Sequence, residues 1–405
     1  MSSSSLARLL KEKRVLVCCG AGGVGKTTVS ASLALGAAQA GLRVVVITID
    51  PSRRLAETLG VSPNQDAPTE LSADRLASVG VSPPGSLSAW MLDPALVCDH
   101  VVRTVSKSAA DAEELMNNRL YKNIAQLVAG MQEYTAVEAL HGFVVDDRYD
   151  LVVLDTPPSR NALRFLETPH RANGFLDPKI FNLFLPSPDG ALQKAAGKVI
   201  RKILDLGLGE ESRTELQQFL DLFMVILKHL NHNQEEMRNF FASSDVSFLL
   251  VTSPNQAAVE EAFYFEQKTR ELNLPLGGYI LNRSLIREQS LPTLSLNDMP
   301  SAPPGVAESA VNKMMDLAAQ EDEIIQRHLA LGRQLQERVG TSSQLSVLPR
   351  LRTDASDLEA LVELSHILKG TQPISRHAEA SRPSVPPSAA GMPTSQSWFP
   401  PKNQS

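Results

Sequence analysis

Residues 18–28, CCGAGGVGKTT, form the stretch of sequence that decides the fold. The stretch satisfies the phosphate-binding pattern G-x-x-x-x-G-K-S/T through Gly20, Gly25, Lys26 and Thr27. An apolar, β-prone run, residues 14–19, precedes it, and an Ala- and Leu-rich run typical of a helix, residues 27–40, follows it. A glycine-rich loop between a strand and a helix is the context that this pattern requires. The stretch therefore predicts a binding site for a nucleoside triphosphate.

The residue types in the loop have distinct physical roles. Glycines let backbone N–H groups curl around a phosphate, and the N-terminus of the following helix adds a partial positive charge. We expect the Lys26 ammonium to reach the β- and γ-phosphates and the Thr27 hydroxyl to be a ligand of Mg²⁺. The residues expected to contact the nucleotide in this loop are Gly22, Gly23, Val24, Gly25, Lys26, Thr27 and Thr28.

Two aspartates end apolar runs elsewhere in the chain. Asp50 ends RVVVITID, residues 43–50, and Asp155 ends DLVVLD, residues 150–155, which is a Walker B pattern. Acids at the carboxyl ends of strands lie where nucleotide chemistry occurs in α/β proteins. We expect Asp155 to contact Mg²⁺ opposite the loop hydroxyl, and Asp50 to be a metal contact that also orients or deprotonates the attacking water. The alternative for Asp50 is a strand-ending residue that only caps the next helix.

Composition narrows the class of protein. The chain has 405 residues, of which 43% are hydrophobic and 21% charged, so it has the composition of a soluble globular protein. The net charge of −6 argues against a nucleic-acid partner. There is no apolar segment of signal-peptide type at the N-terminus, and the cysteines, Cys18, Cys19 and Cys98, form no C-x-x-C pair. We therefore expect a cytoplasmic protein.

Apolar runs alternate with helical sequence along the chain. Strands are predicted at residues 14–19, 43–50, 150–155, 246–252, 276–282 and 345–348. This alternation predicts the α/β class, with a doubly wound, mostly parallel sheet of the P-loop NTPase type and a helical insertion. Residues 61–86 are rich in Pro, Ser and Asp and are expected to be loop-like, with a short edge strand near residues 89–92.

The same patterns divide the chain into five parts. They are an N-terminal tail (1–12), the first part of the ATPase core (13–174), a helical insertion subdomain (175–245), the second part of the core (246–369) and a disordered Pro/Ser-rich tail (370–405). In the insertion, residues 219–230 are apolar on nearly every face. Such a helix either belongs to a core or lines a groove for a client's membrane helix.

These segments together resemble the ArsA family of P-loop ATPases, which includes the soluble ATPase of arsenite efflux pumps and the ATPase that delivers tail-anchored membrane proteins. The likeness extends over residues 13–369. It is carried by the loop at 20–28, by IDPSRRL at 49–55, by GMQEY at 130–134 and by DTPPSRNALR at 155–164. The resemblance implies that the nucleotide is ATP with Mg²⁺, and that Asn282 and Pro349 hold the adenine. It also implies an ATPase that couples rearrangement of a dimer to anion transport or to delivery of a membrane-protein client.

The chain departs from the family pattern at the second loop residue. Ala21 stands where relatives carry a lysine that reaches the nucleotide of the other half of a dimer. Arg53, Arg54 and Arg160 are candidates to replace this charge; the alternative is that they are ordinary surface arginines. A homodimer would lack the lysine in both halves, whereas a heterodimer with a homologous ATPase could supply it. The missing lysine also leaves open a slow, nucleotide-dependent switch or scaffold that acts through a homologous partner.

Overall fold

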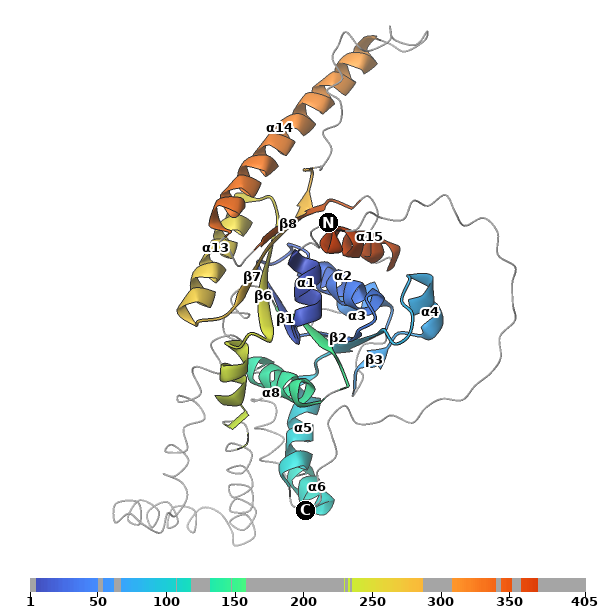
Figure 1. The fold of residues 1–405 in the computed structure, drawn as a ribbon, viewed down its shortest axis with the longest axis vertical. Coiled ribbons are helices and arrows are strands. Elements are labelled where there is room, and N and C mark those ends of the chain that lie inside the picture. The colour runs from blue at the N-terminus through green and yellow to red at the C-terminus, as the bar shows by residue number, and fades with distance from the viewer. Residues whose placement is uncertain are drawn as a thin grey trace, which may run out of the picture.

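The structure is a computed structural model of the chain, shown in Figure 1. It describes residues 5–49, 54–61, 67–106, 108–117, 132–146, 148–157, 229, 232–233, 235–286, 308–339, 344–351 and 358–370. Most of the predicted helical insertion and of the predicted C-terminal tail lies outside these residues.

The fold is built on an eight-stranded sheet with the order β3-β4-β2-β5-β1-β6-β7-β8. The strands are β1 (Val15–Cys19), β2 (Arg43–Thr48), β3 (Thr69–Glu70), β4 (Ser86–Met91), β5 (Leu151–Asp155), β6 (Val246–Thr252), β7 (Leu276–Ser284) and β8 (Gln344–Pro349). All neighbouring strands are parallel except β3, which pairs with β4 in the antiparallel sense. The predicted α/β class and mostly parallel sheet are confirmed.

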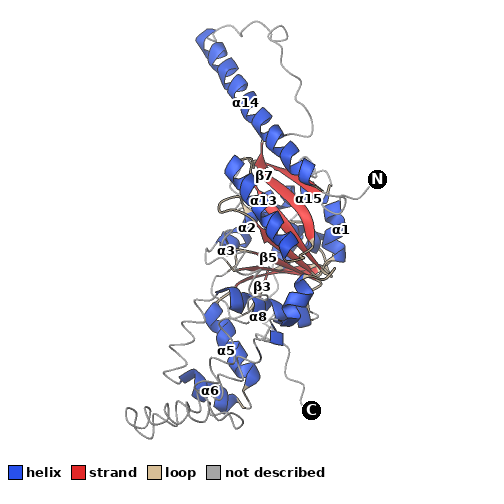
Figure 2. Ribbon diagram, turned by 90° about the vertical axis from the view of Figure 1, so that its left-hand side faces the viewer, coloured by secondary structure: helices blue, strands red, loops and turns tan. Residues whose placement is uncertain are grey.

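Helices cover both faces of this sheet (Figure 2). One face carries α1 (Ser5–Glu12), α2 (Lys26–Gln39), α3 (Arg54–Leu59), α4 (Ala73–Ser78) and α15 (Leu358–Lys369). The other face carries α5 (Pro94–Val105), α8 (Gln132–Val145), α13 (Gln256–Glu271) and one end of α14 (Glu308–Arg338), and α6 (Ala109–Asn117) packs against α5. No helix in the described part of the chain combines the length and the apolar character needed to cross a bilayer.

The central strand shows why these residues form a two-sided core. In β1, Leu16 and Cys18 point into the core beneath α1, α2 and α15, whereas Val15, Val17 and Cys19 point into the core beneath α8 and α13. Side chains of successive strand residues alternate between faces, so a parallel strand covered on both faces must be apolar throughout. All five β1 residues are fully buried.

The structure corrects two sequence-based expectations. The segment 61–86, expected to be loop-like, contains β3 and α4, so β3 forms the sheet edge and β4 lies inside it. The segment 1–12, expected to be a tail, contains α1, whose Leu6 and Leu10 are buried. Leucines four residues apart share one face of a helix, which explains how so short a segment packs against the core.

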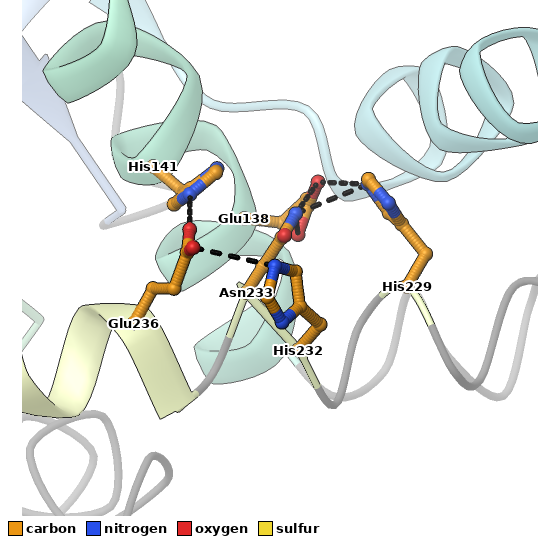
Figure 3. A network of polar contacts seen from close by, with 6 residues as sticks. All are labelled: Glu138, His141, His229, His232, Asn233 and Glu236. Carbon is orange, nitrogen blue, oxygen red and sulfur yellow. Dashed lines mark hydrogen bonds and ion pairs between the residues drawn. The ribbon is translucent and has the colours of Figure 1, made fainter.

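A polar network joins α8 to the segment that precedes β6 (Figure 3). The buried Glu138 carboxylate accepts hydrogen bonds from Asn233 Nδ2 at 3.0 Å to each oxygen, and His229 Nε2 lies 3.2 Å from it. One turn further along α8, His141 Nε2 lies 2.8 Å from Glu236 Oε2, and this hydrogen bond lowers the pKa of Glu236. The network fixes the end of the predicted insertion to the sheet domain.

Candidate nucleotide site

Sheet register brings the ends of three strands together. In the parallel ladders, Asp155 of β5 is the partner of Cys18 of β1 on one side and of Thr48 of β2 on the other. The glycine loop begins one residue after β1 and leads into α2. The predicted loop and the predicted Walker B aspartate therefore lie side by side at the carboxyl edge of the sheet, which is where ligands bind in open α/β sheets.

The loop conformation depends on its glycines. Gly25 has a φ of 89°, and a Cβ there would lie 2.4 Å from Asn282 Nδ2. A Cβ at Gly20 would lie 2.0 Å from the carbonyl oxygen of Val251. Gly25 is also the N-cap of α2 and offers no side chain to cap the helix. The first N–H groups of α2 are thus accessible to an anion.

Lys26 lies across the loop. Its ammonium donates hydrogen bonds to the carbonyl oxygens of Gly20 at 3.1 Å and Ala21 at 2.8 Å, and the side chain is buried. A buried lysine must be paired with acceptors to offset the loss of solvation. These two bonds hold the positive charge against the loop, next to the N-terminus of α2.

The next residue of α2 connects the loop to the Walker B strand. Thr27 Oγ1 donates to Asp155 Oδ2 at 2.7 Å, and Thr48 Oγ1 donates to the same oxygen at 3.1 Å. Asp155 is only 1% exposed. A hydroxyl and a carboxylate in direct contact form an oxygen donor set that suits Mg²⁺, which binds few protein ligands and retains several waters. The residues present therefore fit the metal that the sequence predicts.

The predicted adenine residues lie near the carboxyl ends of β7 and β8. Asn282 Nδ2 donates to the carbonyl oxygen of Val24 at 2.9 Å, so β7 contacts the loop directly. Pro349 ends the adjacent strand β8, where it is the ladder partner of Ser284. Both residues thus share the edge of the sheet that carries the loop.

Not every predicted residue can be placed. Asp50, Arg53 and Arg160 lie outside the residues that the structure describes, and Arg54 is described only as the first residue of α3. Gly22 and Gly23 are exposed on the loop, and Thr28 is partly buried in the first turn of α2. Ala21 is 7% exposed and packs in the same core as Val24.

The cysteines beside the loop have no thiolate character. Burial raises the pKa of Cys18 and of Cys19 to about 12, and it does the same for Cys98. Such thiols remain protonated at neutral pH and behave as small apolar side chains. The chemistry of this site rests on the loop, the hydroxyls and the carboxylate.

Sequence reasoning missed two polar residues at the site. Thr48 stands near the end of the apolar run 43–50, which predicts only a strand there, and its hydroxyl contacts Asp155. Arg283 follows the predicted Asn282, and its Nη1 donates to the carbonyl oxygen of Gly23 at 2.9 Å. No local pattern distinguishes this arginine from a surface residue, because its partner is 260 residues away.

Comparison with known proteins agrees with this geometry. A family model described as anion-transporting ATPase matches residues 13–295, more than half of the chain. The chain belongs to the anion-transporting ATPase family. The resemblance to ArsA-type ATPases is thereby confirmed.

Relatives of this anion-transporting ATPase family member include both pump-associated and GET3-type proteins. A putative arsenical pump-driving ATPase of Halobacterium salinarum is 29% identical over 170 residues, which cover 42% of this chain and 26% of that protein. ATPase GET3C of Arabidopsis thaliana is 27% identical over 297 residues, which cover 69% of each chain. Putative arsenical pump-driving ATPase 1 of Aquifex aeolicus is 24% identical over 254 residues, or 62% of this chain and 58% of its own. The chain thus spans less than two thirds of two of these three relatives.

Proposed function

We propose that this family member binds ATP with Mg²⁺ in the loop between β1 and α2 and hydrolyses it. The observation that carries the proposal is the 2.7 Å contact between Thr27 Oγ1 and Asp155 Oδ2. It joins the two halves of a Walker-type site, which lie 128 residues apart in the sequence. A chance glycine loop has no reason to begin its helix on a buried aspartate at the end of a neighbouring strand.

In this proposal the chain's own groups bind and orient the nucleotide. The N–H groups of residues 22–28 and the Lys26 ammonium bind the phosphates, and Asn282 and Pro349 hold the adenine. Thr27, Asp155 and Asp50 would hold Mg²⁺, which neutralises negative charge on the β- and γ-phosphate oxygens. Asp50 orients or deprotonates the attacking water. Most of the catalysis then comes from positioning and electrostatics, as is general for phosphoryl transfer.

The test is calorimetric titration of the purified chain with Mg·ATP. Lys26→Ala should weaken ATP affinity by well over about tenfold and abolish hydrolysis, because it removes the charge that binds the phosphates. The matched control is Lys268→Ala, which removes a lysine that pairs with Glu271 on the surface of α13. Unchanged ATP affinity in a folded Lys26→Ala protein would refute the assignment.

We further propose that the chain works as a dimer, either with itself or with a homologous ATPase. Rearrangement of this dimer on nucleotide binding would drive anion transport or delivery of a membrane-protein client. The names of the relatives support this proposal, since two are called putative arsenical pump-driving ATPases and one is called ATPase GET3C. No nucleic-acid partner is proposed, because the net charge is −6.

A slow nucleotide-dependent switch is the second candidate, and Ala21 is the observation that favours it. Its methyl side chain is 7% exposed, so it cannot reach a nucleotide bound to another subunit. Measurement of turnover with and without a homologous ATPase partner separates the two candidates. Turnover that stays slow with every partner favours the switch, and strong activation by the partner favours the coupled ATPase.

A further inference from the structure

A β-bulge at the end of β7 turns two side chains toward the phosphate loop. Leu281 pairs with Val347 and Ser284 with Pro349, so β7 has one more residue than β8 over this interval. Within the bulge Arg283 has a φ of 59°, in the left-handed region. This conformation is unfavourable for a residue that has a Cβ atom. β-Bulges next to active sites commonly redirect a side chain. The backbone of this bulge thus directs the side chains of Asn282 and Arg283 toward the phosphate loop.

The bulge aims both of its side chains at consecutive loop carbonyls. Arg283 Nη1 donates to the Gly23 oxygen at 2.9 Å, and Asn282 Nδ2 donates to the Val24 oxygen at 2.9 Å. The Arg283 backbone N–H in turn donates to Asn282 Oδ1 at 2.9 Å, which fixes the amide orientation. The three bonds form one connected unit between β7 and the loop.

These contacts belong to a larger set of hydrogen bonds that the carbonyl oxygens of the loop accept. When the N–H groups of a loop point toward an anion, its carbonyl groups point away and need donors of their own. Lys26 supplies donors to the Gly20 and Ala21 oxygens, and the N–H of Val29 supplies one to Gly25. Gly23 and Val24 lie between these residues, and their carbonyl oxygens accept hydrogen bonds from Arg283 and Asn282.

We propose that Arg283 is a positioning residue of the ATP site, a proposal that rests on the proposed function. By binding the Gly23 carbonyl, the guanidinium fixes the peptide plane between Gly23 and Val24, whose N–H group would face the phosphates. The phosphates would recruit Lys26 when nucleotide binds, whereas the exposed Arg283 can remain in place. An exposed arginine without this role would gain nothing from a left-handed backbone within a bulge.

The experiment compares Arg283→Asn, Arg283→Lys and the wild type. Asparagine tolerates a left-handed backbone but is too short to reach Gly23, so Arg283→Asn removes the contact and leaves the bulge intact. Arg283→Lys restores a cation of sufficient length without the planar guanidinium. Arg327→Gln is the matched control, since Arg327 is an exposed arginine on α14.

We expect Arg283→Asn to weaken binding of Mg·ATP and Mg·ADP alike by about tenfold, because loss of one charge-assisted hydrogen bond disturbs a loop that both nucleotides use. KM should rise by the same factor while kcat changes by less than about twofold, as for loss of uniform binding. Arg283→Lys should recover part of the affinity, and the thermal midpoint should match that of Arg327→Gln. A purely structural role would instead lower the thermal midpoint and leave nucleotide affinity intact.

Two results would overturn the inference while the proposed function stands. One is wild-type affinity for both nucleotides in Arg283→Asn. The other is a loss for ATP without a loss for ADP, which would place the guanidinium at the γ-phosphate. Absence of nucleotide binding by the wild-type chain would overturn the proposed function and this inference with it.

Discussion

Thr27 and Thr48 offer a matched test of the magnesium assignment. Both hydroxyls donate to Asp155 Oδ2, at 2.7 Å and 3.1 Å, but only Thr27 belongs to the phosphate loop. Replacement of either residue by valine keeps the shape and removes one donor to the same oxygen. The two variants therefore share a structural loss, and only Thr27→Val also loses the proposed metal ligand.

The loss of stability that the two variants share can be estimated from the geometry of these hydrogen bonds. Asp155 is 1% exposed and Thr48 is 1% exposed, so the bond between them lies in the interior. A hydrogen bond to a charged group contributes about 1.5–3 kcal/mol, and here the carboxylate retains its other donor in each variant. We expect each substitution to lower the free energy of unfolding by about 1–2 kcal/mol, with Thr27→Val at the lower end because Thr27 is only partly buried.

The metal requirement should distinguish the two variants. Thr27→Val is expected to raise the Mg²⁺ concentration for half-maximal ATP hydrolysis by more than about 100-fold, because loss of a direct ligand should exceed the roughly 10- to 100-fold cost of losing a group that only orients a ligand. Thr48→Val should raise it by about tenfold, because Thr48 only orients the carboxylate, which keeps its contact with Thr27. Urea titration without nucleotide measures the loss of stability, and Mg²⁺ titration at fixed ATP measures the change in the Mg²⁺ requirement. Equal shifts in both variants, or none in Thr27→Val, would refute the assignment of Thr27 as a ligand.

Three further predictions concern the rest of the chain. The carboxylate of Glu266, which is 1% exposed, accepts a hydrogen bond from Tyr279 at 2.6 Å. Glu266→Ala leaves the buried Tyr279 hydroxyl without this acceptor and should lower the free energy of unfolding in urea by about 1–3 kcal/mol, and Tyr279→Phe should lower it by about 1–2 kcal/mol. Burial lowers the pKa of His100 from 6.5 to about 4, so the unfolded chain takes up the proton first. Stability should therefore fall as the pH drops from 6.5 to 4, and a His100→Gln variant should show a smaller decline in its urea midpoint over that range. Ala21→Lys should raise the turnover of the isolated chain if a homodimer forms, and a dilution series of the ATPase rate would show whether turnover depends on association. The same substitution should lower the free energy of unfolding by about 1–3 kcal/mol, because Ala21 is packed in the core.

Much of the fold follows from the sequence because buried parallel strands have a strong local signal. The runs VLVCC and LVVLD are apolar on both faces, and the structure places them next to each other as β1 and β5. The loop residues were predictable for a similar reason. Their chemistry depends on residue type at fixed spacing within one strand–loop–helix unit, so a single stretch contains the required information.

Other features depend on contacts that no local pattern encodes. β3 has only two residues and forms because the edge of β4 is available for pairing. The strand is too short to have a pattern of its own, and the Pro and Ser residues around it predict a loop. The Arg283 contact depends on a bulge, which arises from register between β7 and β8. Neither strand sequence specifies this register alone, and so the side chain that reaches Gly23 could not be predicted from its position after Asn282.

The Arg283 contact also bears on the proposed dimer, for which the family resemblance implies a lysine at the position of Ala21. The Arg283 guanidinium donates at 2.9 Å to the Gly23 carbonyl of its own loop, and Gly23 lies only two residues from Ala21. We therefore propose that Arg283 holds its own loop and does not supply a charge to the other subunit of the proposed dimer. In the proposed dimer this charge would come from the segments that carry Arg53, Arg54 or Arg160, or from a homologous partner. Because a cation on the transferring phosphate is worth about 10³–10⁵ in rate, the source of this charge decides between a slow switch and a working ATPase.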